Sequence, residues 1–246
     1  WPRGGTGEIG HCRTESRTLR RQKMDVVEAM RTRKSIRAFK PDPVSKQILA
    51  EILEAACRAP SALNTQPWEF FVIGGAALEE VCSENVRLLK SGAPLELEVA
   101  ESAFPRESVY RKRQVELAKQ LFRLMGIARE DEEKRTEWTL RGFRHFDAPA
   151  AIVIVRDECL SGPGPLMDIG AVMQSICLAA LKYGLGTCIA RQGVFYPGVL
   201  RKVAGIPESK RIVIAIAIGT PDWGFPANAV ETDREPAEAI TTWVGF

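Results

Sequence analysis

Two stretches of the sequence concentrate side chains that bind anions or flat polar ligands. The first runs from Arg31 to Arg37, where four cations and the hydroxyl of Ser35 lie within seven residues. Guanidinium and hydroxyl groups are the donors that a phosphate monoester needs, so this segment is a candidate phosphate site. A solvated basic surface would show the same pattern, and the segment alone does not separate the two interpretations.

The second stretch runs from Ala59 to Trp68 and consists mainly of small and amide side chains with a proline near each end. Such a loop can present backbone N–H groups and two amides to a flat polar ligand. The alternative is an ordinary connection between a helix and a strand.

The elements on either side of the second stretch are clear in the sequence. Ser45 is placed to cap a helix predicted over residues 45–58, whose apolar residues recur at helical spacing. Pro60 disfavours the helical conformation of Ala59 and therefore ends the helix. Residues 68–73 are aromatic and β-branched, which predicts a strand. Further elements are expected as helices at 25–30, 77–89, 107–125, 130–141, 167–183 and 196–204, and as strands at 149–155, 187–190 and 212–218.

In this order, the two stretches resemble the start of proteins of the nitroreductase family of flavin enzymes. That family opens with a basic Arg-x-Ser-x-Arg segment, which is followed by a helix and then by Pro-Ser-x-x-Asn-x-Gln-Pro-Trp. Two later blocks, Asp168–Cys188 and Asn228–Pro236, resemble the same family. The resemblance extends from Met24 to about Pro236 and is weakest over residues 91–145.

The resemblance implies an α+β fold, with a mixed central sheet flanked by helices, and an obligate, intertwined homodimer. It implies FMN in each of two clefts at the subunit interface. Arg33 and Arg234 would hold the FMN phosphate, with Lys34 and Ser35 beside it. Arg37 would reach the ribityl chain and the N1/O2 edge of the flavin ring, where a cation stabilises the negative charge of the reduced state.

The remaining cofactor contacts implied by the family come from two other segments. The other subunit would contribute four residues against the isoalloxazine ring: Pro60, Ser61, Ala62 and Asn64. The backbone from Ala190 through Arg191 to Gln192 would face flavin N5. Arg111 or Arg113 is a further candidate for the flavin edge.

By this resemblance, the protein is an FMN-dependent oxidoreductase that takes hydride from NAD(P)H. It would reduce nitroaromatics, quinones or similar flat acceptors by a two-electron ping-pong mechanism. No catalytic side chain is expected, because the chemistry takes place at FMN N5. The alternatives are a reductive dehalogenase-like or flavin-fragmenting relative, or a flavin-binding protein without physiological turnover. Gly184-x-Gly186 lacks the third glycine of the dinucleotide-binding fingerprint and follows a helix instead of a strand.

Composition excludes several other classes. The chain of 246 residues has a net charge of +3, but residues 1–23 contain six of the 34 Lys/Arg and only two of the 31 Asp/Glu. The remainder is close to neutral, which gives nucleic-acid binding no electrostatic support. Only two histidines and six cysteines without metal-type spacing occur, so no metal site is expected. We expect free thiols, a cytoplasmic location and no membrane span.

Residues 1–23 lack hydrophobic periodicity and are expected to be a disordered extension. Residues 24–246 are expected to form a single domain, with a helical insertion or lid at about 91–145. Aromatic residues along this insertion either line a substrate pocket or pack the insertion onto the core. The helix at 167–183 is apolar on nearly every side, which favours burial against its twin across a dimer interface.

Overall fold

A four-stranded antiparallel sheet forms the centre of the fold. The computed structural model describes residues 24–100 and 103–246, so the expected extension at 1–23 lies outside the described residues. In the order in which they pair, the strands are β1 (Glu69–Gly74), β2 (Ala150–Asp157), β4 (Lys210–Gly219) and β3 (Gly186–Ile189). All three strand pairs are antiparallel. The α+β class is confirmed, but the mixed sheet is a correction: in the described part of the chain the parallel component is a single bridge between Ser35 and Thr187.

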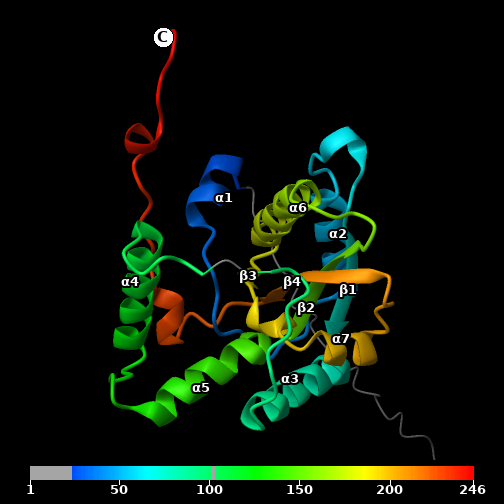
Figure 1. Cartoon of the computed structure of the whole chain (residues 1–246), viewed down its shortest axis with the longest axis vertical. Helices are drawn as coiled ribbons and strands as arrows, with labels where there is room; N and C mark the ends of the chain where they lie inside the picture. Colours follow the sequence, from blue (N-terminus) through cyan, green and yellow to red (C-terminus); the bar gives the residue numbers. More distant parts are fainter. Residues whose placement is uncertain (1–23, 101–102) are drawn as a thin grey trace, which may run out of the picture.

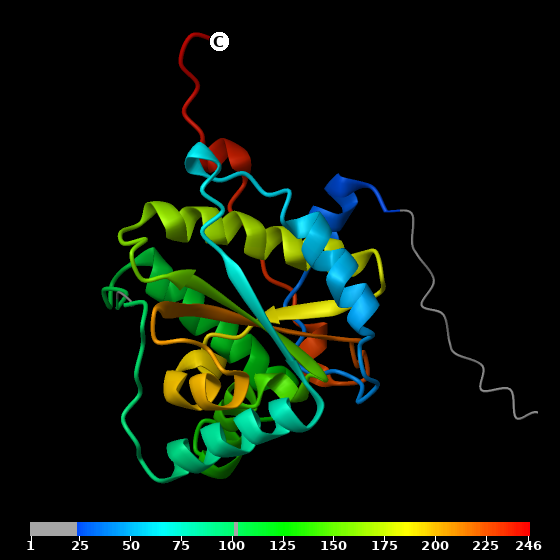
Figure 2. The same ribbon diagram turned by 90° about the vertical axis from the view of Figure 1, so that its right-hand side faces the viewer.

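Helices cover both faces of this sheet, as Figure 2 shows. The helices on the two faces are α2 (Lys46–Ala56) with α6 (Gly164–Leu181), and α3 (Gly75–Lys90) with α7 (Pro197–Ala204). Successive side chains of a strand point to opposite faces, and β2 divides accordingly. Ile152 and Ile154 pack with α2 and α6, whereas Val153 and Val155 pack with α3 and α7.

Three further helices surround this layered core: α1 (Val26–Thr32), α4 (Val109–Leu124) and α5 (Glu132–Phe143). Helix α4 packs through Leu121 against Ala227 and Val230. Residues 231–246 are exposed throughout and leave the body beside α4 as an arm that ends at the C-terminus (Figure 1).

The helix and strand predictions agree with the structure to within a few residues. The Ser45 hydroxyl caps α2 by accepting a hydrogen bond of 3.2 Å from the Gln47 backbone N–H. The start of the expected insertion is tied to the core, because Glu98 accepts hydrogen bonds of 2.6 Å from both the Arg201 guanidinium and the Ile212 backbone N–H.

Helix α6 crosses one face of the sheet and is apolar along most of its length. Within the described residues it is the one helix that is long and apolar enough to cross a membrane, by length and composition only. One side of α6, which includes Ile169, Val172 and Ile176, lies in the core, and this burial accounts for the apolar residues on that side. Met167 on another side is 75% exposed.

Candidate functional site

The basic segment lies in an extended conformation beside β3, at the C-terminal end of α6. The Ile36 backbone N–H donates to the Thr187 carbonyl over 2.9 Å, and Ile36 itself is 2% exposed. Ile36 and Phe39 pack with Cys188 and Ala190 in one apolar cluster. These two anchors hold the intervening segment on the sheet edge and leave Arg33, Lys34 and Ser35 half-buried.

Arg37 is a half-buried cation at the end of this segment. Its Nη1 donates to the Ser35 carbonyl over 3.3 Å, and no carboxylate forms an ion pair with it within the described ranges. Burial lowers the pKa of the Arg37 guanidinium, which shows that the surroundings solvate its charge poorly. Burial also raises the pKa of the nearby Cys188 thiol to about 11, so this neutral group does not balance the charge. An anionic ligand would balance the charge of Arg37.

The segment that begins at Ala190 leaves the end of β3 on the same side. The Ala190 backbone N–H donates to the Ala215 carbonyl over 2.7 Å, and a 3-10 turn, η3 (Gln192–Val194), follows. The Gln192 side chain lies against Gly142 of α5, while Gly193 lies against the ring of His145. Burial lowers the pKa of Arg191. Ala190 shares its cluster with Ile36, so the structure brings this segment close to the basic segment.

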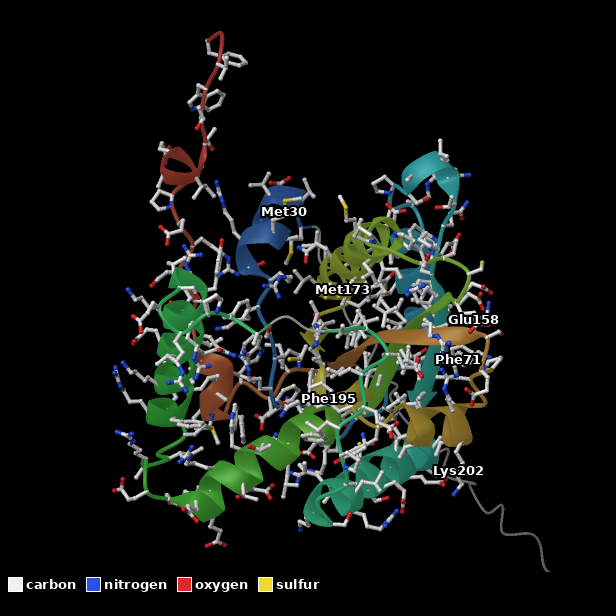
Figure 3. The ribbon with its side chains drawn as sticks, viewed as in Figure 1. Met30, Phe71, Glu158, Met173, Phe195 and Lys202 are labelled. Atoms are coloured by element: carbon white, nitrogen blue, oxygen red, sulfur yellow. The ribbon has the colours of Figure 1, made fainter. Side chains whose placement is uncertain are left out.

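The rings around η3 show how closely α5 supports this segment. Figure 3 shows Phe195, directly after η3, beside the C-terminal end of α5. The rings of Phe195 and Phe143 make an edge-on contact with centroids 5.8 Å apart. Phe143 at this end of α5 is 2% exposed, so α5 contributes to the core behind the site.

The loop at 60–64 lies at the opposite end of α6. The Ala62 backbone N–H donates to Asp168 Oδ2 over 3.2 Å, near the start of α6. From Asp168 to Leu181 the helix rises by about 20 Å. One chain therefore does not bring Pro60, Ser61, Ala62 and Asn64 together with the basic segment.

This loop nevertheless has a defined shape. The Ser61 hydroxyl accepts from the Gln66 backbone N–H over 3.0 Å, and the Gln66 amide donates to Asn64 Oδ1 over 3.1 Å. Leu63, Asn64 and Gln66 have positive φ angles of 52°, 58° and 46°, a left-handed conformation that is unfavourable for a leucine. Leu63 is 99% exposed. The loop is thus an ordered projection with its tip directed away from its own chain.

Arg234 lies in the C-terminal arm, and within the described residues its hydrogen bonds go to Thr232 and Asp233. Its Nη1 donates to the Thr232 hydroxyl over 2.8 Å, and its neighbour Glu235 forms an ion pair of 2.6 Å with Arg113 of α4. In the described residues no hydrogen bond or ion pair joins Arg234 to the basic segment. Arg111 and Arg113, the further candidates for the flavin edge, lie in the exposed first turns of α4.

Sequence reasoning assigned no role to three residues that the structure places around the site. Asn228 is 1% exposed and accepts the Arg37 backbone N–H over 2.6 Å. Arg141 donates to the Arg37 carbonyl over 3.1 Å. His145 is fully buried behind Gly193, where burial lowers its pKa to about 4. The first two contacts join residues 191 and 104 positions apart, so no local pattern could have shown them.

The sequence of this chain is similar to those of known proteins. The profile of the Nitroreductase family matches residues 30–220. The chain belongs to the nitroreductase family. A nitrobenzene nitroreductase of Ectopseudomonas oleovorans is 32% identical over 219 residues, which cover 88% of this chain and 96% of the relative. A chloronitrobenzene nitroreductase of Comamonas testosteroni has the same identity and coverage.

Solved structures give the same result for the fold. The FMN- and NADPH-dependent nitroreductase NfnB from Sphigopyxis sp. strain HMH superposes with a TM-score of 0.83 at 27% identity, over 91% of this chain and all of that chain. The FMN-dependent NfnB from Mycobacterium smegmatis, solved in complex with NADPH, has a TM-score of 0.82 at 24% identity, over 89% of this chain and all of that chain.

Proposed function

We propose that this protein is an FMN-dependent nitroreductase that uses NAD(P)H to reduce nitroaromatic compounds. The observation that carries the proposal is Arg37, a half-buried guanidinium without a carboxylate partner in the described chain, next to the segment that starts at Ala190. The names of the relatives support the substrate class, since two of them are reductases of nitrobenzene and chloronitrobenzene.

The residues at the site fit FMN. Arg33, Lys34 and Ser35 are half-buried and offer cations and a hydroxyl for the phosphate, and Arg234 would join them there. Arg37 would lie at the N1/O2 edge, where its charge stabilises the negative charge of the reduced ring. The backbone of Ala190, Arg191 and Gln192 would face N5. When bound, FMN accepts a hydride from NAD(P)H and passes two electrons to the acceptor.

A homodimer would complete each site. The loop with Pro60, Ser61, Ala62 and Asn64 lies about 20 Å along α6 from the basic segment of its own chain, so a second chain would supply it. Apolar side chains without cover support this assembly: Met167 is 75% exposed, and Trp243 and Phe246 of the C-terminal arm are 69% and 100% exposed. An arm and a helix face of this kind are suited to wrapping around a second copy of the chain.

The finer features of the activity are proposals on the same basis. Quinones and similar flat acceptors would also be reduced, because a flat ring is what the flavin face accommodates. The mechanism would be ping-pong, with NAD(P)H leaving before the acceptor enters the same face. A cytoplasmic location suits the five cysteines of the described residues, which are all free thiols.

The proposal is tested by purifying the full chain and mixing it with NADPH in a stopped-flow instrument. We expect a yellow protein with about one FMN per chain, rapid bleaching of the flavin absorbance, and reoxidation by nitrobenzene. A colourless protein that does not take up added FMN would overturn the cofactor assignment. A yellow protein that NADH and NADPH both fail to reduce would indicate a flavin-binding protein without turnover.

A further inference from the structure

The main chain of Arg37 is held by two remote side chains. One of them, Asn228, also donates to the Ala38 carbonyl over 2.8 Å, whereas Ile36 and Lys40 pair with other main-chain groups. Ile36 donates its N–H to the Thr187 carbonyl, and Lys40 donates to the Thr220 carbonyl. At Arg37 itself, Asn228 Oδ1 accepts the N–H over 2.6 Å and Arg141 Nη2 donates to the carbonyl over 3.1 Å. Both polar groups of this residue's main chain therefore depend on remote side chains.

Arg141 is itself fixed in three directions. Its Nη1 forms an ion pair of 2.7 Å with Asp147, and its Cζ lies 4.4 Å from the centroid of the Phe225 ring. Only 16% of its side chain is exposed. The Asp147 side chain is 43% exposed, so this ion pair is only partly buried and is weak evidence for a role in stability.

We propose that Arg141 of α5 is a positioning residue of the flavin site, which holds Arg37 in place from behind and thereby sets the reduction potential of the bound flavin. This inference rests on the proposed function, because it takes Arg37 as the cation at the N1/O2 edge. A displacement of the Arg37 backbone moves its guanidinium, and the interaction with the charge of the reduced ring weakens steeply in a poorly solvated site.

The packing behind the second flavin segment supports this role for α5. The Gln192 side chain fills the position that a Cβ of Gly142 would occupy, and Gly142 directly follows Arg141. One turn further on, the buried His145 ring touches Gly193. The end of α5 therefore contacts both segments that would face the flavin. This end of α5 supports the site from behind.

The test compares Arg141→Met with Arg141→Lys and with the matched control Arg144→Met. Arg144 lies three residues further along and binds Asp147 and Glu137, whereas the Arg37 carbonyl takes its hydrogen bond from Arg141. The three variants and the wild type are titrated with FMN and with riboflavin, and the midpoint potential of the bound flavin is measured.

Arg141→Met should weaken the binding of reduced flavin about tenfold more than the binding of oxidised flavin. For a two-electron couple this difference lowers the midpoint potential by about 30 mV. The loss should be equal for FMN and riboflavin, because Arg37 does not face the phosphate. Arg141→Lys should recover part of the shift, since an ammonium group keeps the charge but not the planar fork. Arg144→Met should keep the wild-type potential.

Equal potentials in Arg141→Met, Arg144→Met and the wild type would overturn the inference while leaving the proposed function intact. If Arg141→Met does not fold, Arg141→Lys decides, and a wild-type potential and affinity in that variant would equally overturn it. A wild-type protein that binds no flavin would instead contradict the proposed function.

Discussion

A mixed dimer of two inactive variants tests whether each flavin site is shared between two chains. One variant, Arg33→Glu, reverses a charge in the basic segment. The other, Ser61→Trp, fills the loop that a second chain would supply. The two positions lie at opposite ends of α6, about 20 Å apart along its axis. Each substitution therefore leaves the other segment of its own chain undisturbed.

The expected recovery follows from the symmetry of the dimer. In a mixed dimer one site combines the basic segment altered by Arg33→Glu with the loop altered by Ser61→Trp, and the other site combines two unaltered segments. Random assembly of equal amounts makes half of the dimers mixed, so about one site in four is intact. Each variant alone should have little FMN and little activity. The mixture should regain about a quarter of the wild-type level of both.

The assay is co-refolding of equal amounts, followed by measurement of bound FMN and of NADPH-dependent nitrobenzene reduction. The matched control replaces Ser61→Trp with Arg37→Glu, which places both defects in the same segment, so every site of the mixed dimer remains damaged. Mass spectrometry establishes that mixed dimers have formed. If they form and neither flavin nor activity returns, the shared site is refuted.

Three further predictions concern single residues. Arg234→Ala should weaken FMN binding about 10- to 150-fold, by the loss of a charge-assisted phosphate contact, and leave riboflavin binding unchanged, so calorimetric titrations with equal losses for both ligands would contradict the assignment. Because burial lowers the pKa of folded His145 from 6.5 to about 4, the free energy of unfolding should fall by about 3 kcal/mol as the pH drops from 7 to 4. Urea unfolding of His145→Phe should lack this part of the pH dependence. A pH dependence identical to that of the wild type would contradict the assignment to His145. Gly193→Ala should cost about 1–3 kcal/mol in the same assay, since its Cβ would lie 2.5 Å from His145 Cε1, whereas Gly198→Ala, with open space around it, should not destabilise the protein.

Local chemistry made most elements of the fold predictable. The hydroxyl of Ser45 caps the start of α2, and Pro60 follows its end at Ala56 by four residues. Both act within a few residues of their own positions. The alternation of β2 places isoleucines on one face and valines on the other. The mixed sheet was predicted wrongly, because the pairing direction depends on how strands meet in space and not on their composition.

The sequence by itself determined the family, the helices and strands, and the basic segment with its candidate phosphate-binding groups, because each of these depends on residues close together in the chain. The tertiary structure alone decided that the loop at 60–64 and Arg37 lie at opposite ends of α6. It also decided that Arg141 and Asn228, from positions 104 and 191 residues away, hold the main chain of Arg37. An arginine on a charged helix has the same local pattern whether it faces solvent or a buried carbonyl. Only the packing of α5 against the core distinguishes the two.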